Sequence, residues 1–171
     1  MKKNLMAATP GAASPLSGEP APGVALAEGE RMTDNDFDRE LERQIIEHED
    51  LKLKPYRCSA GKLTLGVGRN IEDNGISTAE AMVMLRNDIT RTRFALEKVF
   101  PGFLGLSRRR RLALIDMCFN LGLPRFLGFK KMLAAVVAGD FNQASEEMLS
   151  SRWAEQVGQR ARTLATMMRE G

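Results

Sequence analysis

The strongest constraint on the fold lies in residues 47–70, where an amphipathic helical pattern runs directly into a short, glycine-rich hairpin. Apolar residues at Phe37, Leu41 and Ile45 recur at every fourth position, which predicts a helix with one face turned inward. The next position on that face is Glu49. Because an unpaired carboxylate away from water is costly, three interpretations are open: a general acid, the partner of a core arginine, or a residue in a fraying last turn.

The hairpin is predicted from the residues after Pro55, which stops the helical pattern. Residues 56–58 and 63–68 are typical of two strands about a Ser-Ala-Gly turn. Alternation separates an apolar face, Leu63, Leu65 and Val67, from a face that a ligand can approach closely, Thr64, Gly66 and Gly68. A two-residue loop pairs Cys58 with Leu63, whereas a three-residue loop with Gly61 left-handed pairs Cys58 with Lys62, on the side of Thr64. We expect the three-residue loop.

The rest of the chain predicts mainly helices. A turn at 73–75 precedes a capping box, Ser77 and Glu80, which opens a long helix ended by Pro101. The inward side chains of that helix are expected to be Met82, Leu85, Ile89 and Leu96. Ser107 caps a largely apolar central helix that stops at Gly122 or Pro124, and further helices are expected at 128–138, 141–156 and 158–169. The fold class is therefore α+β and mainly α, with a small β element near its start.

Residues 1–32 hold four of the seven prolines and many Ala, Gly and Ser residues, so we expect a flexible leader before a single domain at 33–171. A cleaved signal peptide is not expected, because Pro10 and Gly11 cut the apolar segment to about five residues where 7–15 are usual. Nowhere does an apolar run approach the roughly 20 residues of a membrane-spanning helix.

Composition limits the chemistry. With one histidine and two dispersed cysteines the sequence argues against metal catalysis, and we expect no cofactor. We expect Cys118 in the core, whereas Cys58 is either a small buried hydrophobe or a reactive thiol, since Arg57 and Lys62 nearby favour a thiolate. The run Arg108–Arg111 is interpreted as a solvated face, with nucleic-acid contact as the weaker alternative.

The spacing of the hairpin residues resembles that of the phage-type lysozymes, the T-even-like endolysins of glycoside hydrolase family 24. Glu49 is followed after eight residues by Cys58, and Cys58 after five residues by Thr64 and then Leu-Gly-Val-Gly. This spacing is similar to that of the family's acid, second catalytic residue and threonine. Residues 111–122 and 151–161 resemble its central helix and its late Ser-Arg-Trp segment. The resemblance implies a two-lobe, lysozyme-like fold with a small β-hairpin lobe, a long bridging helix and a C-terminal helical bundle.

The same resemblance implies a muramidase, which cleaves the β-1,4 bond between N-acetylmuramic acid and N-acetylglucosamine in peptidoglycan. It makes Glu49 the general acid that protonates the leaving oxygen, and Thr64 the residue that positions water or substrate. Cys58 stands where the best-known relatives have Asp and some phage members have Cys, and a thiolate can activate water or attack the anomeric carbon. The residues expected at the substrate cleft are Gly66, Gly68, Phe119 and Phe129.

Arg69 stands where relatives often have His paired with an acid, and Asp88 occupies the matching position on the long helix, so we predict an Arg69–Asp88 ion pair. The expected partner is peptidoglycan, with no nucleic acid, acted on by a monomer. Such an enzyme is expected in the host cytoplasm until a phage-made membrane hole releases it to the periplasm, or it is associated with the virion. Two other hypotheses stay open: a non-catalytic envelope-binding module, motivated by the missing Asp, and a basic helical nucleic-acid binder.

Overall fold

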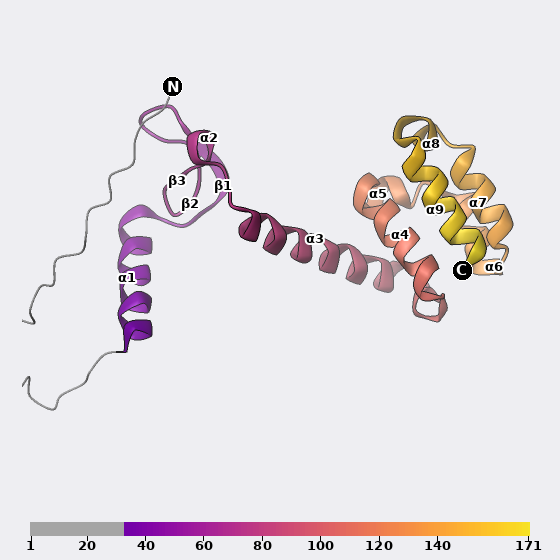
Figure 1. Ribbon diagram of the computed structural model, residues 1–171, viewed down its shortest axis with the longest axis horizontal. Coiled ribbons are helices and arrows are strands. Elements are labelled where there is room, and N and C mark those ends of the chain that lie inside the picture. Colours follow the sequence, from indigo (N-terminus) through magenta and orange to yellow (C-terminus); the bar gives the residue numbers. More distant parts are fainter. Residues whose placement is uncertain (1–32) are drawn as a thin grey trace, which may run out of the picture. The chain divides into compact units, whose positions relative to one another are not determined.

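A computed structural model describes residues 33–171 of the protein (Figure 1). The predicted leader, residues 1–32, and the expectation about a signal peptide lie outside the described residues. The described chain divides into two compact units, one made of residues 33–56 and 64–69 and the other of residues 57–63 and 70–171.

Helix α1 spans Asp34–Glu49, and the Thr33 hydroxyl caps it by accepting a hydrogen bond from the amide three residues on. The helix is predicted correctly, but its burial is not. It buries none of its residues, and Phe37, Leu41 and Ile45 are 58%, 41% and 43% exposed. The predicted inward face is therefore not buried within the unit that holds α1.

A small antiparallel sheet follows, with the strands in the order β1 (Lys52–Arg57), β2 (Leu63–Gly66) and β3 (Arg69–Asn70). The sequence predicts the first strand only from residue 56, but β1 begins earlier and includes Pro55. The sheet tolerates this proline because β1 lies at its edge, where a missing N–H need not cost a ladder hydrogen bond. β2 ends two residues before the predicted end, because Gly66 and Gly68 take φ values of 69° and 68° and turn the chain.

The loop between β1 and β2, residues 58–62, has the predicted three-residue form and is called the Cys58 loop. The Cys58 amide donates to the Lys62 carbonyl at 3.0 Å, and the Gly61 amide donates to the Cys58 carbonyl at 2.8 Å. Gly61 has a φ of 76°, in the left-handed region that the three-residue loop requires. The predicted pairing of Cys58 with Lys62 is confirmed.

Two helices lead from the sheet. The predicted turn at 73–75 is instead the end of one helical turn, α2 (Ile71–Asn74), capped by the Asn70 side chain. Helix α3 spans Thr78–Val99 and begins with the predicted capping box, in which Ser77 and Glu80 exchange hydrogen bonds. Of the side chains expected to face inward, Leu96 is buried. Met82, Leu85 and Ile89 are exposed, because the packing of α3 against other helices is concentrated toward its C-terminal end.

The remaining elements form a helical bundle, which Figure 1 shows in orange to yellow. They are η1 (Phe103–Gly105), α4 (Arg108–Leu121), α5 (Leu123–Phe126), α6 (Lys130–Ala138), α7 (Phe141–Leu149), α8 (Arg152–Val157) and α9 (Gln159–Glu170). Ser107 caps α4 and Gly122 ends it, as predicted. The helix expected at 141–156 is two helices, since the Ser151 hydroxyl accepts from the Ala154 amide at 3.1 Å and starts α8. The short α5 is not predicted by the sequence.

The described core lies in this bundle. Helix α4 packs against α9, α3 and α5, and buries Ala113, Leu114, Met117 and Cys118. Helix α7 lies between α6 and α9 and has contacts with both. Trp153 is buried, as expected, and its indole N–H donates to the Asn120 side-chain oxygen at 2.7 Å. Across residues 33–171, no helix is both long and apolar enough to cross a membrane.

Candidate active site

The carboxylate of Glu49 lies against the glycine turn of the hairpin. A Cβ atom built on Gly68 would stand 3.1 Å from Glu49 Oε2, and the φ of Gly68, 68°, already favours glycine. Glu49 is the last residue of α1 and is exposed to water. Of the three interpretations of Glu49, its exposure agrees with a residue in the last turn that reaches water, and its role as general acid stays a prediction.

The next residue, Asp50, has a φ of 62°, the one positive value among the described non-glycine residues. Its amide still donates to the Ile46 carbonyl at 3.0 Å, so the helix is hydrogen-bonded up to this point. Such a backbone conformation costs on the order of 1–3 kcal/mol for an L-residue. The chain therefore takes a strained, sharp exit from α1 directly after the candidate acid.

Thr64 and Gly66 differ in their surroundings, although the sequence places them on one face of β2. Thr64 is 2% exposed, which makes it one of two buried polar residues in the described chain. Gly66 is half-buried, and a Cβ built there would meet nothing within 4 Å. Open space therefore adjoins the backbone at Gly66, as expected for a position that a ligand approaches, while Thr64 is held inside.

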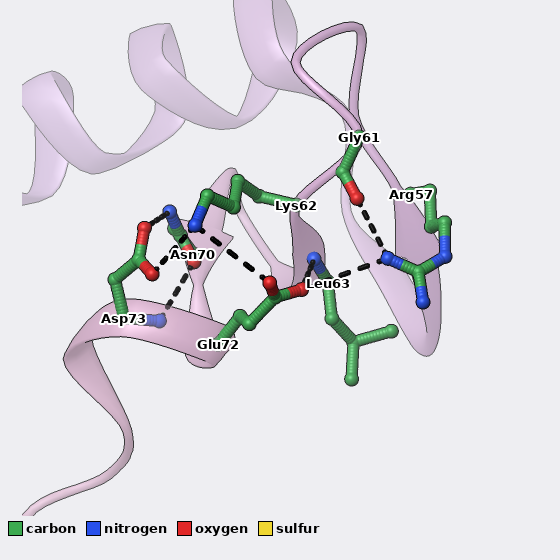
Figure 2. A network of polar contacts seen from close by, with 7 residues as sticks. All are labelled: Arg57, Gly61, Lys62, Leu63, Asn70, Glu72 and Asp73. Atoms are coloured by element: carbon green, nitrogen blue, oxygen red, sulfur yellow. Dashed lines mark hydrogen bonds and ion pairs between the residues drawn. The ribbon is translucent and has the colours of Figure 1, made fainter.

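Cys58 is half-buried, forms no disulfide and lies in a loop bound by charged groups (Figure 2). Arg57 Nη1 donates to the Gly61 carbonyl at 2.7 Å and lies 3.6 Å from Glu72 Oε2. Lys62 Nζ lies 3.7 Å from Glu72 Oε1 and 2.8 Å from Asp73 Oδ1. Two cations and two carboxylates thus surround the base of the Cys58 loop.

The acid pair, Glu72 and Asp73, comes from α2. Glu72 Oε2 also accepts the Leu63 amide at 3.0 Å, where β2 begins. Asp73 accepts from the Asn70 side chain at 2.8 Å, and the Asn70 oxygen accepts from the Asp73 amide at 3.1 Å. The hydrogen bond from Lys62, followed by that from Asn70, lowers the pKa of the Asp73 carboxyl below its usual value of 3.8. The sequence analysis missed this pair, whose only local signal is an Asn cap followed by two acids.

The two phenylalanines predicted for the cleft lie in different grooves of the larger unit. Phe119 is 40% exposed and lines a groove of about 700 Å³, whose other apolar walls are Leu85, Ile89, Leu112, Ile115, Leu164 and Met167. Phe129 is half-buried and meets the Trp153 ring edge to face at 6.3 Å. It lines a second groove of about 540 Å³, together with Arg125, Lys130 and Lys131. The structure does not bring the two rings together.

Asp88 is engaged on its own helix. Its carboxylate pairs with Arg91, and its carbonyl accepts the Thr92 hydroxyl at 2.8 Å. Arg69 belongs to the other compact unit. The Arg69–Asp88 ion pair stays a prediction.

The arginine run at the start of α4 is only partly a solvated face. The Arg110 guanidinium lies 3.5 Å from the centre of the Phe141 ring, and donates to the carbonyls of Met168 and Arg169 at 2.9 and 3.3 Å. Arg109 pairs with Glu170 at 3.3 Å. These two side chains hold the end of α9 against α4, which gives them a structural task inside the protein.

Two polar residues in the second half of α4, Asp116 and Asn120, have side-chain partners on other helices. Asp116 accepts from Arg160 Nε at 2.7 Å, and Asn120 accepts from Trp153. Burial raises the pKa of the Cys118 thiol from 9.0 to about 11, which fits its expected place in the core. Over residues 33–171, no three His, Cys, Asp or Glu side chains gather as metal ligands would.

Comparisons with known proteins give a family match and several similar phage proteins. The family model described as phage lysozyme matches residues 46–169. The pre-baseplate central spike protein Gp5 of Enterobacteria phage T4 is 26% identical over an alignment of 167 positions, which covers 81% of this chain but 29% of that protein. An endolysin of Acyrthosiphon pisum secondary endosymbiont phage 1 is 31% identical, covering 65% of this chain and 75% of its own. A SAR-endolysin of Escherichia phage Mu is 32% identical, covering 67% of each chain.

Proposed function

This chain belongs to the phage lysozyme family, and on that premise we propose that Glu49 and Cys58 together hydrolyse the β-1,4 bond between N-acetylmuramic acid and N-acetylglucosamine. A lysozyme is a glycoside hydrolase, and its substrate is peptidoglycan. One observation carries the assignment of the acid: the Glu49 carboxylate lies on the glycine turn of the hairpin, 3.1 Å from where a Gly68 Cβ would be. A helix-borne acid held against an open backbone is suited to protonating a leaving oxygen.

Glycoside hydrolysis needs a second group on the other side of the sugar. That group either activates water, which inverts the anomeric carbon, or attacks the carbon itself, which retains its configuration. A Cys58 thiolate is chemically able to do either, but a free thiol has a pKa of about 8.5 and needs help to ionise near neutral pH. Arg57 and Lys62, on either side of the Cys58 loop, supply positive charge that favours the thiolate. Thr64 is proposed to position water or substrate.

Muropeptide analysis of digested peptidoglycan tests this function, because the bond that is cut and the anomer that is released report activity and stereochemistry together. Glu49→Gln is expected to lower the rate by about 100-fold or more, and Cys58→Ala to abolish cleavage. Cys58→Asp is the matched control. It restores a group that is ionised at pH 5, so it should remain active with a lower pH optimum.

Two results would contradict the proposal. Full activity of Glu49→Gln would remove the acid from the mechanism, and normal activity after alkylation of Cys58 would remove the thiol. Binding of glycan strands without release of reducing ends, by wild type and by Cys58→Asp alike, would instead support the non-catalytic envelope-binding module.

We also propose that the enzyme acts as a monomer, either in host lysis from the cytoplasm or in wall penetration from the virion. The similar proteins include two endolysins and a central spike protein, so both roles have support. Size-exclusion chromatography with light scattering tests the monomer. Proteomics of purified virions against lysates tests the location, since a virion enzyme stays with the particle after washing and an endolysin does not.

A further inference from the structure

Glu72 contacts one residue of the Cys58 loop and the two residues that flank the loop, as the network of Figure 2 shows. Its Oε2 atom accepts the Leu63 amide at 3.0 Å and lies 3.6 Å from Arg57 Nη1, while its Oε1 atom lies 3.7 Å from Lys62 Nζ. The Glu72 carboxylate therefore contacts Arg57, which precedes Cys58, Lys62, which pairs with Cys58, and Leu63, the first residue of β2.

The backbone of the loop depends on the same set of contacts. Arg57 Nη1 donates to the Gly61 carbonyl at 2.7 Å, and Gly61 in turn donates its amide to the Cys58 carbonyl at 2.8 Å. Because Glu72 lies against Arg57, the carboxylate helps to keep the guanidinium folded over the loop. An acid outside the loop thus adds to the contacts that hold the two cations beside Cys58.

We propose that Glu72 is a positioning residue for Cys58: by fixing Arg57 and Lys62 and by adding its own negative charge, it sets how readily the Cys58 thiol ionises. This inference rests on the proposed catalytic role of Cys58. The charged groups in contact around the loop are Arg57 from β1, Lys62 from the loop itself, and Glu72 and Asp73 from α2.

Of these four groups two are positive and two are negative, so the carboxylates offset part of the positive charge that favours the thiolate. Replacing Glu72 with Gln removes one negative charge but keeps an oxygen that can accept the Leu63 amide. Arg57 can still donate to the Gly61 carbonyl, and Lys62 can still pair with Asp73. The loop keeps its contacts while its net charge becomes positive, so the thiolate is favoured.

The experiment measures the rate of Cys58 alkylation by iodoacetamide from pH 6 to pH 10, in the full chain, with peptide mass spectrometry to count Cys58 and Cys118 separately. Glu72→Gln should lower the pH midpoint for Cys58 by about 0.5 and raise its rate at pH 7 by about threefold. Lys62→Gln should move the midpoint upward by a similar amount. Glu146→Gln, the same charge change at an exposed site on α7, should leave it unchanged.

Cys118 reports whether a variant is folded, because it is buried and its thiol ionises only at high pH. If Glu72→Gln exposes Cys118 to alkylation, Lys62→Gln decides the question. The proposal is overturned if a folded Glu72→Gln has the wild-type midpoint for Cys58, even where Lys62→Gln shifts it. Alkylation needs no catalysis, so shifted midpoints in an enzyme that fails to cut peptidoglycan would support this inference and contradict the proposed function.

Discussion

At the scale of single residues, the site depends on one position that has no side chain. Gly68 combines a positive φ with an approach by Glu49 Oε2 to 3.1 Å of its missing Cβ. Of the other glycines with positive φ, most have nothing within 4 Å of such an atom. A positive φ is therefore shared by glycines in many turns of the described chain, but at Gly68 a side chain would also meet the candidate acid.

Gly68→Ala is expected to lose both stability and activity. The positive φ alone should cost about 1 kcal/mol, and the new methyl group should push the Glu49 carboxylate away from the hairpin. Gly139→Ala is the matched control, since Gly139 has a φ of 76° and open space around it, at the end of α6. Thermal unfolding should show a similar loss in both variants, whereas muropeptide release should fall only for Gly68→Ala. Equal activity of the two variants would contradict the placement of Glu49.

At the scale of elements, side chains of the arginine run at the start of α4 join helices, although the sequence favoured a solvated face for this run. The clearest case is the contact between the start of α4 and the end of α9. There Arg110 stacks on Phe141 and donates to two carbonyls that α9 leaves without intrahelical partners. A cation at a helix C-terminus is also favoured by the helix dipole.

Arg110→Ala should lower the free energy of unfolding by about 2 kcal/mol, through the loss of charged hydrogen bonds and the cation–π contact. Arg108→Ala is its control, because Arg108 is exposed and has no polar contact with the described residues. Urea denaturation followed by circular dichroism measures both variants. An equal, small effect of the two substitutions would show that the contact contributes nothing.

Local signals in the sequence predict much of the element order. The Ser77–Glu80 capping box, the Ser107 cap and the Gly122 stop are all at their predicted positions, because each uses contacts within a few residues of the chain. The prediction of a single helix at 141–156 was wrong. The Ser151 cap that starts α8 is also a local signal, but the apolar pattern across it favoured one continuous helix.

Features that depend on distant residues were not predictable in this way. The contact between Glu49 and Gly68 joins residues that are distant in the sequence, and it was not predicted. The spacing from Glu49 to the hairpin carries no information on which carboxylate would bind Arg57 and Lys62, because Glu72 reaches them only after the chain has folded back through β3. The burial of the α1 face likewise depends on a partner surface, not on periodicity.

At the scale of the whole molecule, the core of the helical bundle sets the stability, and a buried thiol makes that stability depend on pH. Burial raises the pKa of Cys118 from 9.0 to about 11. The unfolded chain therefore ionises this thiol first as the pH rises. The contribution of Cys118 is fully present below about pH 9 and is lost as the pH approaches 11.

Wild type should lose about 2–3 kcal/mol more than Cys118→Ala between pH 8.5 and pH 11. Cys118→Ala is less stable at every pH because of the cavity, but that loss does not vary with pH. Urea titrations at several pH values measure the difference between the two proteins, in which the titration of lysines and tyrosine cancels. A constant difference across this range would show that the thiol ionises equally in the folded and unfolded chains.

The contact between Glu49 and Gly68 also limits which mutations codon 68 can tolerate. Every amino-acid replacement reachable from a glycine codon by one nucleotide change adds a Cβ atom, so codon 68 has no conservative neighbour. At most other glycines of positive φ, a mutation incurs backbone strain that a compensating change elsewhere can offset. At codon 68 the same mutation also displaces the candidate acid, and improved stability would not restore it. Random mutagenesis under selection for lysis should therefore leave codon 68 depleted of variants while codon 139 drifts.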